Sequence, residues 1–220
     1  MLNLQTGSAN HAVETPHCSK AVGGRQHSVT LNSGRREEHN VTTTRFDADH
    51  VAEYLERYAE TQGVLPERLA EFGDAYRSQG YLTRDQLYEI AYESSTRSAY
   101  HVESNPEDRC RTVTRNVRQL EDDFSQIHLL SGLSGFKAPT ASCVLTALDP
   151  ERHAIVDTRV WATLDRFDYL DGRKESFDAV DYVTMMGPIR EIAAETGYTT
   201  EEVGYALFAY DAEHREGTLH

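Results

Sequence analysis

Apolar residues recur along most of the chain with the spacing of an α-helix. Val51, Tyr54, Leu55 and Tyr58 occupy positions i, i+3, i+4 and i+7, which places their side chains on one face of a helix. No segment shows the clear alternation of apolar and polar residues that is typical of a half-buried strand. Further helices are expected over 65–76, 120–131, 139–148, 158–168, 177–195 and 200–213. A chain of about eight helices with short connections predicts an all-α domain.

Polar residues mark the starts of several of these helices. Thr83-Arg84-Asp85-Gln86 and Thr199-Thr200-Glu201-Glu202 both place a Gln or Glu three residues after a threonine, which predicts a capping box at each start. Asn105-Pro106-Glu107 marks another helix start. Pro188 has no N–H to donate, so we expect it to kink or split the helix over 177–195.

Residues 1–43 differ in composition from the rest of the chain. They are rich in Ser, Thr, Asn, Gly and His and have almost no helical periodicity. Such a segment buries too little apolar surface to offset the entropy lost on ordering, so a disordered tail is expected. An incorrectly assigned start is the alternative. Residues 44–220 then form the helical domain, with enough chain for one hydrophobic core.

The most informative segment is the helix-turn-helix at about 120–148, in which a tight turn joins two of the expected helices. The turn reads Leu133-Ser134-Gly135-Phe136-Lys137, and Gly135 permits the positive φ that such a turn needs. The second helix opens with Pro139 and is rich in small residues, which permits close packing. Its first N–H groups and positive dipole end point at the turn, where Lys137 adds a charge. The turn is therefore suited to hold a phosphate.

Residues 129–167 resemble the helix-hairpin-helix DNA glycosylase superfamily, which includes endonuclease III, the adenine glycosylases and the 8-oxoguanine glycosylases. The resemblance lies in the hairpin 133–137, the Thr140-Ala141 pair that opens the next helix, and Val156-Asp157-Thr158. It implies a helix-hairpin-helix glycosylase-like fold and a divergent member of haloarchaeal type. The implied activity is base-excision DNA repair on duplex DNA that contains a damaged base.

The resemblance also implies roles for individual residues. The backbone of the hairpin, at Gly135, Phe136, Lys137 and Thr140, would bind DNA, and Asp157 would stabilise the positive charge that develops on the deoxyribose. The lysine nucleophile of the bifunctional members falls at Pro139 in this chain, and proline has no amine for a Schiff base. A monofunctional hydrolase that uses water is therefore expected. The chain lacks the four-cysteine iron–sulfur cluster of some members, and Lys137 replaces the second hairpin glycine.

Simpler interpretations stand beside these roles. Asp157 precedes a helix and fits a plain N-cap, a role that is compatible with catalysis. Lys137 fits a solvated turn residue, His153 a surface loop, and Trp161 and Tyr169 packing rather than base stacking. Besides the glycosylase, two functions remain open. One is a non-catalytic nucleic-acid-binding module with an exposed hairpin, and the other is a helical scaffold protein whose hairpin is covered.

Charge alone argues against a nucleic-acid partner, since the formal net charge is −14. However, 19 arginines against three lysines in an acidic chain are typical of a halophilic protein that works in a salty cytoplasm. Four arginines without an acid lie within 109–118, and Arg111, Arg115 and Arg118 share one helix face. This face is a candidate DNA contact, or it pairs with nearby acids. Arg159 is a further DNA-contact candidate, and near Asp157 it would keep that carboxyl ionised.

The spacing of the cysteines and the lack of a long apolar stretch bear on metal binding and on the compartment of the protein. Cys18, Cys110 and Cys143 are far apart and form no CxxC pair, so no metal site, no cofactor and a reducing compartment are expected. No stretch approaches the roughly 20 apolar residues of a membrane span, and no secretory signal opens the chain. A cytoplasmic protein without a membrane partner is the expectation.

Overall fold

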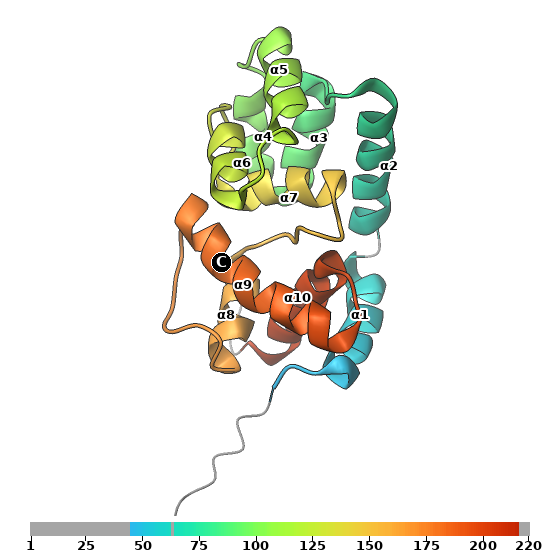
Figure 1. Ribbon diagram of the computed structural model, residues 1–220, viewed down its shortest axis with the longest axis vertical. Helices are drawn as coiled ribbons and strands as arrows, with labels where there is room; N and C mark the ends of the chain where they lie inside the picture. Colours follow the sequence, from blue (N-terminus) through green and yellow to red (C-terminus); the bar gives the residue numbers. More distant parts are fainter. Residues whose placement is uncertain (1–44, 63, 216–220) are drawn as a thin grey trace, which may run out of the picture. The chain divides into compact units, whose positions relative to one another are not determined.

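The computed structural model describes residues 45–62 and 64–215, so the expected tail over 1–43 lies outside the described residues (Figure 1). Within the described part of the chain, every regular element is an α-helix, and the all-α prediction is confirmed. The helices are α1 (Ala48–Gln62), α2 (Val64–Gln79), α3 (Arg84–Ser94), α4 (Thr96–Val102), α5 (Glu107–Val117), α6 (Asp123–Leu130), α7 (Ala138–Leu148), α8 (Thr158–Arg166), α9 (Ala179–Thr196) and α10 (Thr200–His214).

Two helices differ from expectation. The short α4 was not predicted, because its sequence has no extended apolar stripe, although Ala99 and Val102 are fully buried. α9 continues through Pro188 as one helix, so of the two expected outcomes, a kink or a split, the split does not occur. Met185 and Ile189 on either side of the proline are fully buried. Their burial offsets the backbone hydrogen bond that proline cannot form.

The predicted capping boxes are both present. Thr83 accepts a hydrogen bond from the backbone N–H of Gln86, whose side chain binds back to the N–H of Thr83. Thr199 and Glu202 repeat this arrangement at the start of α10. Each box satisfies N–H groups that have no partner inside the helix, which fixes where the helix begins.

The helices pack as two groups that meet at α9 (Figure 1). One group consists of α2–α7, and the other combines α1 with α8–α10, so the first and last described helices lie together. The rings of Tyr58 and Tyr205 stack across α1 and α10, with centroids 4.4 Å apart. α9 packs on α6, where Arg190 donates hydrogen bonds of 2.5 and 3.1 Å to the carboxylate of Asp123.

α7 is the most deeply buried helix of the first group. Every residue from Thr140 to Leu148 is buried. Small side chains allow close packing, since a Cβ atom at Gly73 of α2 would overlap the carbonyl oxygen of Ala147. None of the described helices has the length and apolar character to cross a membrane.

Candidate functional site

The hairpin between α6 and α7 is anchored on its inner side. Gly135 has φ 88°, the left-handed conformation that the sequence led us to expect. Leu133 and Phe136 flank it and are buried in the core. The side chain of Asn105 holds Ser134 by two hydrogen bonds, because Asn105 Nδ2 donates to the Ser134 carbonyl and the Ser134 N–H donates to Asn105 Oδ1, each over 2.9 Å.

The outer side of the hairpin is open. Gly132, Ser134 and Lys137 are exposed, and no carboxylate among the described residues pairs with Lys137. Lys137 occupies the N-cap position of α7 without a side-chain cap bond, so the first N–H groups of that helix gain no partner from it. Phe136 and Thr140 are each only 4% exposed, and the N–H of Phe136 already donates to the Leu133 carbonyl.

Asp157 is the N-cap of α8. Its Oδ1 accepts hydrogen bonds from the N–H groups of Arg159 and Val160, both at 2.9 Å. This confirms the capping interpretation. Its other oxygen, Oδ2, has no hydrogen-bond partner among the described residues. One oxygen therefore fixes the carboxylate in place, and the other remains available for a ligand.

Burial sets the protonation behaviour of Asp157. The pKa of its carboxyl is raised, because burial outweighs the two N–H donors and the positive charge of Arg159. The positive charge of Arg159 lowers the pKa of Asp157, as the sequence led us to expect, but this effect is smaller than that of burial. Its Nη1 lies 3.7 Å from Asp211 Oδ2, and its guanidinium lies 5.1 Å from the centre of the Phe208 ring.

A cavity of about 210 Å³ opens beside Asp157. α1, α2, α3, α7, α8 and α10 all contribute to its wall. Its aromatic side consists of Tyr58, Tyr205 and Phe208, and the ring of Phe208 meets that of Tyr58 edge-on at 5.7 Å. The remaining lining residues are Leu65, Glu93, Ser94, Pro139, Cys143, Ile155, Val156, Asp157, Val160 and Gly204.

A groove of about 250 Å³ borders Asp157 on a second side. Lys137 of the hairpin lines this groove together with Asp157, and Ser94 and Pro139 belong to both the groove and the cavity. The structure thus brings the hairpin lysine and the aspartate to the same groove.

No family model, curated protein or solved structure matches this chain. What the site can do is therefore judged from its own residues and their geometry.

The cavity contains residues that the sequence did not single out. Tyr58, Glu93 and Phe208 come from α1, α3 and α10, which are distant in the sequence from the hairpin. The helical spacing of Tyr58 indicated only that it faces the core. Glu93 carries no signal in the sequence, since an acidic residue near the end of a helix is ordinary in so acidic a chain.

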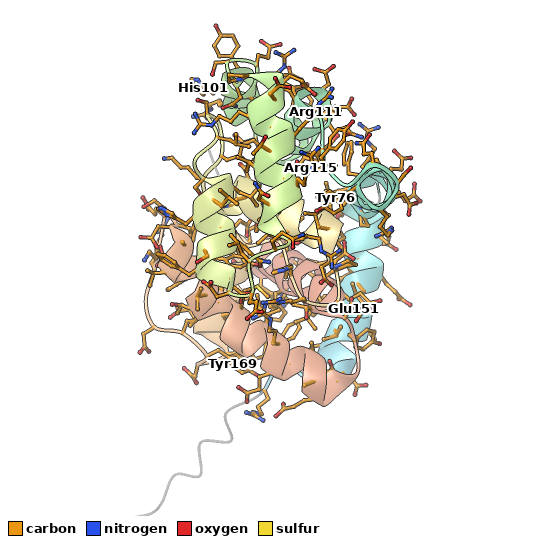
Figure 2. The ribbon with its side chains drawn as sticks, turned by 45° about the horizontal axis from the view of Figure 1, so that its top comes forward. Tyr76, His101, Arg111, Arg115, Glu151 and Tyr169 are labelled. Atoms are coloured by element: carbon orange, nitrogen blue, oxygen red, sulfur yellow. The ribbon has the colours of Figure 1, made fainter. Side chains whose placement is uncertain are left out.

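Arg111 and Arg115 both lie on α5 (Figure 2), and neither lines the groove. The guanidinium groups of Arg111 and Arg115 lie over the Tyr81 ring, at 5.1 and 5.4 Å. Arg111 also donates a 2.6 Å hydrogen bond to Glu107 Oε1, one of the acids that we considered as a partner. Arg118 donates to the Leu148 carbonyl and lies 3.6 Å from Asp149. Their contact with DNA stays a prediction.

His153 is not a surface residue, so that expectation is wrong. It is 2% exposed, and its Nδ1 lies 2.9 Å from the hydroxyl of Tyr182 in α9. Burial lowers the pKa of its imidazole to about 4. Trp161 is buried and donates from Nε1 to the Gly172 carbonyl at 2.6 Å, which agrees with the packing role we expected. Tyr169 packs partly buried against the core (Figure 2).

Metal-ligand side chains are dispersed. Over the described ranges 45–62 and 64–215, no group of three or more His, Cys, Asp or Glu residues is placed to hold a metal ion. Cys110 and Cys143 are buried free thiols, and Cys18 lies outside the described residues. Burial raises the pKa of the Cys143 thiol to about 12, so this wall of the cavity offers a neutral thiol at ordinary pH.

Proposed function

We propose that the protein is a monofunctional DNA glycosylase-like enzyme that removes a damaged base by hydrolysis of its N-glycosidic bond. One observation carries the proposal: Asp157 borders both an aromatic-walled cavity and the groove that contains Lys137 of the hairpin. A flipped nucleotide needs this combination, because its base enters a pocket while its phosphates stay outside on the protein surface.

The hairpin would hold the DNA backbone. Lys137 and the first N–H groups of α7 present positive charge and hydrogen-bond donors at the edge of the groove. The nucleotide would turn about this anchor, and its base would lie against the rings of Tyr58, Tyr205 and Phe208.

Asp157 would serve the reacting sugar. As the C–N bond breaks, its electron pair leaves with the base and positive charge develops on the deoxyribose, next to the free Oδ2. Water then forms the new C–O bond and transfers a proton to the carboxylate. The raised pKa of Asp157 makes it a better proton acceptor than a fully solvated carboxylate. Pro139, which also lines the cavity, supplies no amine.

Base release from duplex DNA tests this proposal. Duplexes that carry uracil, 8-oxoguanine or an alkylated base would be incubated with the protein at high salt and treated with alkali to cleave abasic sites. We expect release from at least one of these duplexes, and failure on the whole panel would contradict the proposal.

Asp157→Asn separates catalysis from folding, because asparagine caps a helix about as well as aspartate but carries no charge. Release should fall by at least about a hundredfold with little change in stability. Asp178→Asn is the matched control, since Asp178 caps α9 through the same two hydrogen bonds and lies outside the cavity. Full activity of Asp157→Asn would exclude a catalytic role.

A non-catalytic nucleic-acid-binding module is the second candidate. The cap bonds of Asp157 favour it, because they give the aspartate a structural role without any chemistry. Binding of duplex DNA without release of any base would support this candidate. The exposed outer face of the hairpin argues against a scaffold protein with a covered hairpin.

A further inference from the structure

Three of the described residues line both the aromatic cavity and the groove, namely Ser94, Pro139 and Asp157. They come from the end of α3, the first turn of α7 and the N-cap of α8. The ring of Pro139 offers no hydrogen-bonding group, and its carbonyl already accepts hydrogen bonds from Ser142 Oγ at 2.6 Å and Cys143 Sγ at 3.4 Å. Within this shared set, only Ser94 and Asp157 therefore have a polar side chain.

The proposed function places the reacting sugar beside these two side chains. Its base would enter the cavity and its phosphates would stay in the groove, so the sugar that joins them would lie where the two spaces share their lining. The attacking water must reach the same sugar. Oδ2 of Asp157 gives this water one hydrogen-bond acceptor, but a water held by a single bond still turns about it, so a second group is needed to aim it.

We infer that the hydroxyl of Ser94 positions the attacking water together with Oδ2 of Asp157. Ser94 is a positioning residue in this reaction, since it acts on the water and not on the base. Both residues are partly buried, so a water can reach them while the surrounding protein fixes their side chains. This inference rests on the proposed function and adds a residue to its reaction.

The neighbours of Ser94 leave its oxygen free to accept a hydrogen bond. Its Oγ lies 3.3 Å from Thr140 Oγ1 on α7, which packs on α3, and the thiol of Cys143 donates instead to the Pro139 carbonyl. When Ser94 donates its proton to Thr140, its lone pairs remain for the water. The water then donates one O–H to Ser94 Oγ and the other to Asp157 Oδ2, which leaves its own lone pairs for the sugar carbon.

The protons and electrons of this step are accounted for. As the new C–O bond forms, the proton bound to Asp157 passes to the carboxylate, and the hydrogen bound to Ser94 stays on the new hydroxyl group. The electron pair of the C–N bond leaves with the base. Ser94 itself gains and loses no proton, so its contribution is to orient the water.

Competition between water and methanol tests this arrangement. Methanol has one O–H, so it donates to Asp157 or to Ser94 but not to both, and the wild type should therefore favour water. Attack by water leaves an abasic site that alkali cleaves. Attack by methanol leaves a methyl glycoside, whose sugar ring does not open, so the strand survives alkali. The released base counts both reactions, and strand cleavage counts hydrolysis alone.

Ser94→Ala removes the acceptor that methanol does not satisfy. The ratio of methanol attack to water attack should rise by about threefold to tenfold, the factor that one hydrogen bond contributes. Ser78→Ala is the matched control and should keep the wild-type ratio, because Ser78 is an exposed serine near the end of α2 and lines neither the cavity nor the groove. A loss of folded protein lowers the yield of both products without changing their ratio, and thermal denaturation of each variant measures it.

The inference and the proposed function fail in different ways. Base release with the same ratio in the wild type and in Ser94→Ala would overturn the role of Ser94 and leave the glycosylase proposal in place. An equal rise of the ratio in Ser78→Ala would overturn it as well, because the change would not then depend on the shared lining. Release of no base from any damaged duplex would contradict the glycosylase proposal and this inference together.

Discussion

The side chain of Asn105 joins the segment before α5 to the hairpin through the backbone of Ser134. It is 3% exposed and forms one donated and one accepted hydrogen bond with Ser134, each of 2.9 Å. A third bond runs from Asn105 Nδ2 to the Val102 carbonyl at 3.0 Å. The open face of the hairpin therefore depends on a buried amide from another part of the chain.

Asn105→Ala should destabilise the protein by about 1–3 kcal/mol, because the N–H and carbonyl of Ser134 lose their partner. It should also weaken DNA binding, since the hairpin loses its support. Denaturant unfolding and DNA titration at one salt concentration measure both effects. Asn116→Ala removes an exposed amide on α5 and should change neither. Unchanged stability of Asn105→Ala would show that the hairpin holds its conformation without this clamp.

Because of His153, the stability of the fold should depend on pH in the acid range. The pKa of His153 is about 4 in the folded protein, below the value of about 6.5 for an unfolded chain. Because the unfolded state binds the proton more readily, stability should be lost as pH falls from about 6.5 to 4, by on the order of 3 kcal/mol in total. Burial keeps the imidazole neutral, and the nearby guanidinium groups of Arg190 and Arg152 also lower its pKa, against the opposite effect of Asp123.

His153→Gln should remove this pH dependence, because glutamine does not titrate and retains a polar group for Tyr182. Urea unfolding at several pH values measures the slope of stability against pH. His128→Gln, on the exposed side of α6, should keep the slope of the wild type. A wild-type slope in the His153→Gln protein would assign the acid sensitivity to other groups.

Local patterns predict the helices and their ends well in this chain. The spacing of Val51, Tyr54 and Tyr58 defines a helix face, and the Thr83 and Thr199 boxes define helix starts, because both depend on residues within one or two turns. The turn at Gly135 follows from the same local rule. Asp157 was identified as a cap for the same reason.

The cavity could not be predicted, because its walls depend on which helices pack together. The stacking of Tyr58 on Tyr205 brings α1 against α10, and no local pattern encodes this pairing. His153 was misplaced for a related reason. It follows the polar residues Glu151 and Arg152, which suggest a surface loop, but α9 covers its side chain with Tyr182.

Lys137 offers a test of the monofunctional mechanism. It is exposed and lines the groove beside Asp157, so its amine is the one to examine for attack on an abasic sugar. We expect no covalent adduct when borohydride is added to the protein with abasic duplex DNA, because Lys137 lies outside the cavity wall. An adduct that disappears in Lys137→Ala would instead show a bifunctional enzyme with a Schiff base at this lysine.

The salt dependence of DNA binding tests the predicted contacts of the α5 arginines. Arg115 has no carboxylate partner among the described residues, whereas Arg111 is bound to Glu107. A DNA phosphate can therefore bind Arg115 without breaking an ion pair, whereas it must displace Glu107 to bind Arg111. If this face contacts DNA, Arg115→Ala should reduce the slope of log K against log salt by about 1. Arg111→Ala should reduce it less.

Arg77→Ala is the control for this experiment. Arg77 is an exposed arginine on α2 that pairs with Asp74, so its loss changes the net charge equally without touching α5. The comparison separates a local contact from the overall charge of an acidic protein, because a general charge effect would appear in both variants. Equal slopes for the wild type, Arg115→Ala and Arg77→Ala would place the DNA contact elsewhere. The exposed Lys137 side of the hairpin would then carry the phosphate binding without help from α5.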